Sequence, residues 1–287
     1  MQAIRSILVV IQPDHLEALA LKRAKLIAGV TQSHLHLLIC AESGEHGGHL
    51  RLLSNALQQD GYSVSSEQAW HGSLHETVSM VQQAEGCGLV IKQHMPDNPL
   101  KKALLTPDDW KLLRYCPCPV LLVKTQTPWS GGTVLAAVDV GNVDGEHRAL
   151  HTRIVEHGFD IANLAKAELH VLSAHPSPAL AAADPAFQLR DTLEDSYLQQ
   201  CRAFQETYDI DDGHLHIAEG PADVLIPHLA HQLRAAVTVI GTVARTGFSG
   251  ALIGNTAEVI LDTLESDILV LKPDSIIEHL EQQLSEH

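Results

Sequence analysis

Residues Val120-Leu-Leu-Val-Lys124 and Ile268-Leu-Val-Leu-Lys272 are nearly the same apolar stretch, present twice in the chain. The spacing between these copies also separates Leu89-Val-Ile91 from Val237-Thr-Val239, and Gly72 from Gly220. A single duplication explains the shared spacing better than separate coincidences. Two further matches are Ser6–Ile11 with Thr133–Val138, and Leu35-His-Leu-Leu38 with Leu169-His-Val-Leu172. The sequence therefore predicts two copies of one domain.

Each copy alternates short apolar runs with longer segments of helical period. The runs are continuously apolar and do not alternate with polar residues, which is typical of strands covered on both faces in a parallel sheet. The predicted fold is α/β, with two tandem doubly wound parallel-sheet domains. The boundary falls in Thr125–Gly132, giving domains 1–127 and 128–287. Helices are predicted at Leu16–Ile27, His75–Gln83, Ala222–Leu233 and Thr256–Leu264.

Composition excludes several classes of function. The formal net charge of −16 argues against a nucleic-acid partner, because such binding needs clustered Lys and Arg. No apolar run reaches the roughly 20 residues of a membrane span, and Met1–Ile11 leads directly into a strand without a signal-peptide pattern. We therefore expect a cytoplasmic protein with no membrane partner. The five cysteines, including Cys116 and Cys118, are expected to be free packing residues.

The second copy carries two extra stretches, around Gly141–His147 and Pro176–Arg190. Both follow predicted strands at the carboxyl edge of the sheet, where ligands of open α/β folds bind. They are interpreted either as a lid or as tolerated surface insertions. The final segment, Ser275–His287, has apolar residues at helical spacing and is expected to be a short docked helix or a frayed tail.

The stretch Gly241-Thr-Val-Ala-Arg-Thr-Gly-Phe-Ser-Gly-Ala-Leu-Ile-Gly-Asn-Thr-Ala-Glu258 follows a predicted strand and opens a helix. A glycine-rich loop of this kind can hold a phosphate, because the backbone approaches closely and the free N–H groups of the helix favour an anion. Asn255 is predicted to cap the helix, with Glu258 at the third helical position.

This loop resembles that of the universal stress protein superfamily, whose nucleotide-binding members show G-x2-G-x9-G-(S/T). The resemblance implies an adenine nucleotide alpha hydrolase-like fold and covers nearly the whole chain. It places Gly241, Ala244, Gly254 and Asn255 on the loop positions, with Arg245 and Thr256 beside them. It also places Val138 and Asp139 where the family holds the ribose and adenine.

Two of the four loop positions depart from the family pattern. Ala244 replaces a glycine, at a cost of about 1 kcal/mol if a positive φ is needed there, and Asn255 replaces the hydroxyl residue. The resemblance implies a phosphorylated small molecule, with ATP or AMP as candidates, in the second domain. A purely structural loop is the alternative.

The corresponding loop of the first copy lacks the glycines of a phosphate-binding loop. Gln93–Thr106 has the same length as Gly241–Gly254 but contains no glycine. Thr106-Pro-Asp-Asp109 is itself a strong helix start, and its carboxylates occupy the end of the helix that attracts anions. We therefore expect no nucleotide in the first domain.

The last strand of each copy is apolar and would form an exposed edge. Family members pair these strands across a dimer, so the resemblance implies an intramolecular pseudo-dimer here, with further homodimer formation left open.

The sequence shows no catalytic constellation and predicts no catalytic residue. Asp184 and Asp191 are not a recognisable acid–base pair, and zinc is not predicted, because no three ligands have compact spacing. The expected function is a non-catalytic stress-response or regulatory protein. A slow ATPase and an adaptor for protein partners are the alternatives. Three histidine pairs could each supply two zinc ligands but lack a compactly spaced third: His147 with His151, His228 with His231, and His46 with His49.

Overall fold

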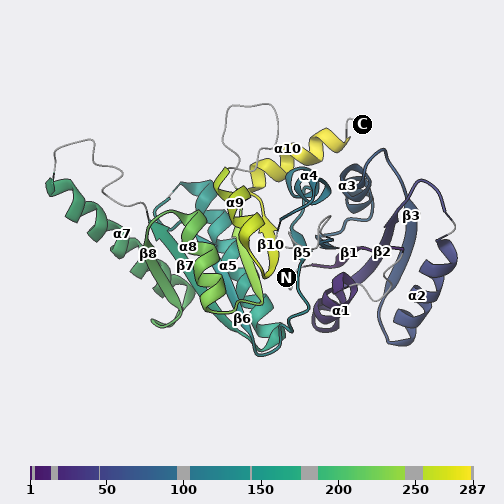
Figure 1. Cartoon of the computed structure of the whole chain (residues 1–287), viewed down its shortest axis with the longest axis horizontal. Coiled ribbons are helices and arrows are strands. Elements are labelled where there is room, and N and C mark those ends of the chain that lie inside the picture. The colour runs from purple at the N-terminus through teal and green to yellow at the C-terminus, as the bar shows by residue number, and fades with distance from the viewer. Residues whose placement is uncertain are drawn as a thin grey trace.

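The structure is a computed structural model, and it describes residues 1, 4–13, 19–44, 46–95, 104–142, 144–175, 187–242 and 255–285. In this part of the chain, ten strands form one sheet in the order β3-β2-β1-β4-β5-β10-β9-β6-β7-β8. The first five sheet positions belong to the first repeat and the last five to the second, which lie side by side in Figure 1. None of the described helices is long and apolar enough to cross a lipid bilayer.

The two repeats have the same topology, with all strands parallel inside each repeat. The first repeat contains β1 (Ser6–Val10), α1 (Leu19–Thr31), β2 (His34–Cys40), α2 (Gly47–Gln59), β3 (Val64–Ala69), α3 (Leu74–Ala84), β4 (Leu89–Gln93), α4 (Pro107–Tyr115) and β5 (Val120–Val123). The second contains β6 (Thr133–Val138), α5 (Gly145–Ala165), β7 (Glu168–His175), α7 (Phe187–Tyr208), β8 (Leu215–Glu219), α8 (Ala222–Gln232), β9 (Val237–Gly241), α9 (Asn255–Thr263), β10 (Asp267–Leu271) and α10 (Asp274–Ser285).

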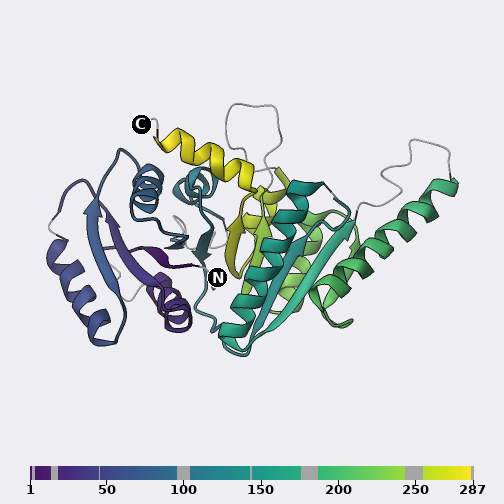
Figure 2. The same ribbon diagram turned by 180° about the vertical axis from the view of Figure 1, so that it is seen from behind.

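The sheet is covered on both faces, as its continuously apolar strands predict. In β1, Ile7 and Val9 pack in a cluster with α1, α2, α5 and α7, whereas Leu8 and Val10 pack in a second cluster with α3, α4, α8 and α9. Figure 1 looks onto α8 and α9, and Figure 2 shows α5 on the opposite face. The doubly wound α/β prediction is confirmed for both repeats.

The repeats join through their last strands, so the predicted pseudo-dimer forms within one chain. β5 and β10 pair antiparallel, with Leu121 opposite Leu269 at the centre. Two lysines then cross this junction: Lys124 Nζ donates to the carbonyls of Leu261 and Leu264 at the end of α9, and Lys272 Nζ donates to Cys116 O at the end of α4, at 2.8 Å. Each repeat therefore places a cation at a helix C-terminus of the other, where the helix dipole favours it. Burial lowers the pKa of Lys124 to about 8.

The described residues of the extra stretch around Gly141–His147 form a turn and the start of a helix, and the lid interpretation stays a prediction. Gly145–His147 form the first turn of α5, and the Asp144 carboxylate caps it by accepting from His147 N at 2.9 Å. The N-cap fixes the helix start here, as short polar side chains do. In the other extra stretch, residues 176–186 lie outside the described residues, and Phe187 onward belongs to α7.

The C-terminal segment is a docked helix. α10 starts in the second repeat and crosses to α3 of the first, where Gln83 Nε2 donates to Ser285 Oγ at 3.1 Å and to Glu281 O at 3.4 Å. Leu280 is buried. Arg153 holds the start of α10 by donating to Asp274 and to Lys272 O. The helix thereby bridges the two repeats along one edge of the sheet, as both views show (Figures 1 and 2).

Candidate ligand site at the carboxyl edge of the second repeat

Three of the predicted ligand residues meet where β6 and β9 end. These strands are adjacent and parallel, with Ala137 opposite Ile240, so Val138, Asp139 and Gly241 lie at the same carboxyl edge. α9 begins beside this edge at Asn255. Ala244, Arg245 and Gly254 lie outside the described residues, and only the backbone of Asn255 and Thr256 is described, in the first turn of α9.

The capping box predicted for α9 stays a prediction, because the side chain of Asn255 lies outside the described residues. Asn255 is the first helical residue, one position earlier than predicted, and Glu258 lies in the first turn. The Glu258 carboxylate accepts a hydrogen bond from Arg114 of the first repeat, with an N–O distance of 2.5 Å. The acidic group in the first turn of α9 is therefore neutralised by a cation from the other repeat.

Gly241 has a packing role that is independent of any ligand. A Cβ at this position would lie 2.7 Å from Leu150 Cδ2 and 3.0 Å from Ile154 Cδ1, both on α5. A side chain at residue 241 would force the Leu150 methyl to shift, so the close packing of α5 against the end of β9 favours glycine.

The turn after β6 presents Asp139 to solvent beside two histidines of α5. Asp139 N donates to His151 Nε2 at 3.3 Å, and Asn142 N donates to Asp139 O at 3.0 Å, which closes the turn. Partial loss of water raises the pKa of the Asp139 carboxyl, against the opposing charge of His147. An exposed carboxylate on a rigid turn is suited to accept hydrogen bonds from a ligand hydroxyl.

His151 should make stability depend on pH. Burial, with the nearby charge of His147, lowers the pKa of His151 to about 4. The unfolded chain binds a proton at this histidine below about pH 6.5, whereas the folded chain does not until about pH 4, so stability falls as pH falls through that window, by up to about 3 kcal/mol. In urea unfolding at pH 7 and pH 4.5, we expect His151→Gln to flatten this slope. The exposed His231→Gln is the control, and equal slopes in His151→Gln and the unaltered protein would contradict the prediction.

Three further polar residues at this edge were missed by sequence reasoning. Ser173 and His175 end β7, next to β6, and Tyr197 comes from α7. Val140 N donates to Ser173 Oγ at 3.1 Å, Ser173 Oγ lies 2.5 Å from Tyr197 Oη, and the rings of His175 and Tyr197 lie 4.8 Å apart. Ser173 and His175 could have been found from their position at the end of a predicted strand. Tyr197 could not, because the extra residues before it prevent its alignment with a residue of the first repeat.

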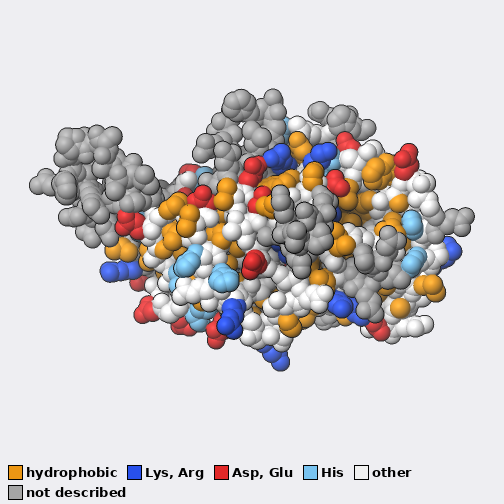
Figure 3. Space-filling view, in the orientation of Figure 1, with side chains coloured by type: hydrophobic (Ala, Val, Ile, Leu, Met, Phe, Trp, Pro, Cys, Tyr) orange, Lys and Arg blue, Asp and Glu red, His pale blue; other side chains and the backbone are white. Residues whose placement is uncertain are grey.

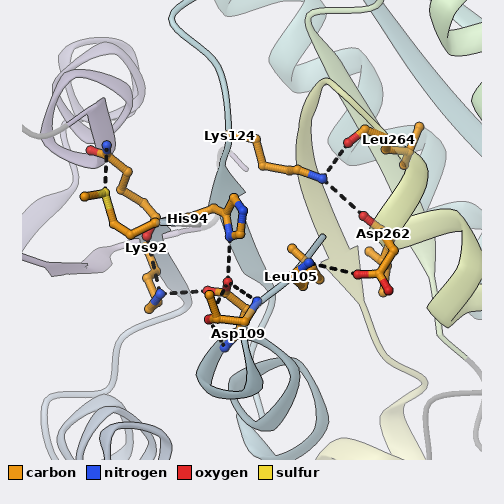
Figure 4. A network of polar contacts seen from close by, with 11 residues as sticks. Lys92, His94, Leu105, Asp109, Lys124, Asp262 and Leu264 are labelled. Carbon is orange, nitrogen blue, oxygen red and sulfur yellow. Dashed lines mark hydrogen bonds and ion pairs between the residues drawn. The ribbon is translucent and has the colours of Figure 1, made fainter. Parts of the chain in front are cut away.

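The corresponding place in the first repeat is filled by the protein's own carboxylate (Figure 4). Asp109 is fully buried and contacts Lys92 Nζ and His94 Nδ1, each at 2.7 Å. Thr106 donates to the same carboxylate through N and Oγ1, which confirms the predicted helix start. Burial alone would raise the pKa of Asp109, but the hydrogen bond from His94 and the charge of Lys92 outweigh it and hold that pKa well below its usual range.

The cysteines are free, and one group that includes two histidines could bind a metal ion. All five cysteines are free, and Cys116 and Cys118 are buried with their sulfurs 3.7 Å apart. Of the predicted histidine pairs, His147 and His151 have ring centroids 6.2 Å apart. Among the described residues, one group has metal-ligand geometry, and sequence reasoning missed it: Glu168, His170 and His214.

Comparisons with known proteins agree with the fold and the duplication. The model of the universal stress protein family matches residues 132–272. Universal stress protein E of Escherichia coli K12 is 34% identical over 222 residues, covering 75% of this chain and 70% of that protein.

Solved structures extend the similarity over the full chain. A functionally unknown protein from Pseudomonas aeruginosa PAO1 is 66% identical with a TM-score of 0.93, covering 100% of this chain and 99% of that one. A universal stress protein from Archaeoglobus fulgidus, 13% identical with a TM-score of 0.62 over 94% of this chain and 99% of that one, shares the fold alone. The chain therefore belongs to the universal stress protein family, in a tandem-domain arrangement, and this membership supports a role in the stress response.

Proposed function

We propose that this protein is a non-catalytic regulator of the stress response that binds a nucleotide, or another phosphorylated small molecule, in its second repeat. The observation that carries the proposal is the meeting of Val138, Asp139 and Gly241 beside the N-terminus of α9. Ligands of open α/β sheets bind at the carboxyl ends of the strands, and helix N-termini bind phosphate through their N–H groups.

The contrast between the repeats supports one ligand for each chain. In the first repeat, the Asp109 carboxylate occupies the start of α4 and pairs with Lys92 and His94. In the second repeat, the acidic residue of the first turn of α9, Glu258, pairs with Arg114. A phosphate at α4 would meet an internal anion, whereas a phosphate at α9 would meet N–H groups and a neutralised carboxylate.

Calorimetric titration with ATP and with AMP tests this proposal. We expect one ligand per chain, and Asp139→Ala should weaken binding about tenfold, because it removes a hydrogen-bond acceptor worth about 1.5 kcal/mol. Gln12→Ala, at the matching position of the first repeat, is the control and should bind normally. No heat with either nucleotide, or equal loss in both variants, would overturn the proposal. Phosphate release in the same samples would instead indicate the slow ATPase.

A further inference from the structure

The outer strands of the second repeat bring together side chains that are distant in sequence. β7 and β8 are paired at the end of the sheet, and Val171 N donates to His214 O at 2.8 Å, which sets His214 beside His170. Side chains alternate along a strand, so Glu168 and His170 share a face of β7 with Leu172. Leu172 packs in the cluster that includes α8, and Figure 3 shows pale blue histidine side chains gathered over α8 and β8.

We propose that Glu168, His170 and His214 bind a divalent transition metal ion, with zinc as the best candidate. One ligand atom from each residue lies within 4.8 Å of the other two, and His170 Nε2 is 3.9 Å from Glu168 Oε2. Zinc sits about 2.0–2.2 Å from imidazole nitrogen and carboxylate oxygen, so ligands of a tetrahedral site lie about 3.4 Å apart. Small rotations of these side chains close the site, with a fourth position left for water.

The ring of His170 is already oriented for this role. His170 is buried, and its Nδ1 lies 3.0 Å from His216 Nε2, with the two rings stacked at 5.2 Å between centroids. A metal-binding histidine usually uses its second nitrogen for such a hydrogen bond, which fixes the tautomer and the ring plane. The other nitrogen, Nε2, is the atom directed toward Glu168.

Carboxylates beside the two histidines also favour a bound cation. Glu168 and Asp211, whose carboxylate lies 3.9 Å from His214 Nδ1, supply negative charge to offset the ion.

The first repeat provides a matched comparison. His36 occupies the position of His170 in the duplicated strand, but its two nitrogens contact Ser65 Oγ at 2.8 Å and Glu67 Oε1 at 3.1 Å. β3 pairs Ser65 with His36, whereas the neighbour of His170 is a histidine. His34 is a second imidazole in the first repeat, but the Ser65 hydroxyl lies between it and His36, at 2.7 and 2.8 Å from their ring nitrogens. Among the described residues, only Glu168, His170 and His214 bring three ligand atoms within range of one ion, so one site per chain is expected. This site is separate from the proposed nucleotide site and does not depend on it.

Zinc titration of untagged, chelator-treated protein against a colorimetric zinc indicator tests the site. We expect one tight equivalent per chain, and His214→Ala and Glu168→Gln should each weaken it at least about tenfold. His36→Ala is the matched control and should leave the affinity unchanged. Cobalt should give the intense visible absorption of a tetrahedral site in the unaltered protein and lose it in His214→Ala. No zinc equivalent above that of His214→Ala, or equal weakening in His36→Ala, would overturn the proposal.

Discussion

Replacing Asp267 with alanine is expected to lower the free energy of unfolding by about 3–5 kcal/mol, because it breaks a buried ion pair and leaves a charge behind. Asp267 is fully buried at the start of β10. Its carboxylate accepts from Arg23 Nε and Trp129 Nε1, each at 2.8 Å. It also accepts from the backbone N–H of Lys124 and Thr125, at 2.9 and 3.0 Å. This one side chain ties α1, the inter-repeat segment and β10 together.

Chemical unfolding of the Asp267→Ala protein measures the effect, and Asp274→Ala is the control. Asp274 pairs with Arg153 at the surface, so its loss should cost no more than about 1 kcal/mol. An Asp267→Ala protein within that same small range of the unaltered chain would show that the Arg23 pair does not hold the repeats together.

Replacing Asp109 with alanine should cost a similar amount, about 3–5 kcal/mol, and should also create an anion site. Lys92 and His94, both buried, would lose their shared partner at the start of α4. A lysine and an imidazole beside a helix N-terminus can hold phosphate or sulfate. We therefore expect phosphate to raise the melting temperature of Asp109→Ala markedly and that of the unaltered protein very little.

Asp108→Ala, one residue earlier on α4 and exposed, is the control for this experiment. It should be close to the unaltered protein in stability and in its response to phosphate. If phosphate stabilises Asp109→Ala and Asp108→Ala equally, then Asp109 does not act as the internal anion of the first repeat.

The fold could be predicted because its signals are local or repeated. The continuous apolar runs of β1 and β5 reflect burial on both faces, and the family resemblance implied that the matching last strands pair. The helix start at Thr106 was also readable, since a capping box needs only neighbouring residues. By contrast, Trp129 lies in the predicted boundary segment yet is buried against Asp267, a contact that no local pattern reveals.

The candidate site was only partly predictable for the same physical reason. The family resemblance placed Val138, Asp139 and Gly241 in one site, and the parallel pairing of β6 with β9 brings them to one edge. Glu168 and His214 come together only through the register of β7 and β8, which the sequence does not specify. The glycine at 241 matched a phosphate-loop pattern, but in the structure its close packing against α5 also favours glycine.

The most direct test of the account is a crystal structure of the protein grown with AMP or ATP. One nucleotide per chain is predicted, with its phosphates at the N-terminus of α9 and its ribose beside Asp139, and with the Asp109 carboxylate still paired to Lys92 and His94 in the first repeat. A nucleotide bound at the start of α4, or both repeats empty under saturating ligand, would contradict the division between a closed first repeat and a ligand-binding second repeat.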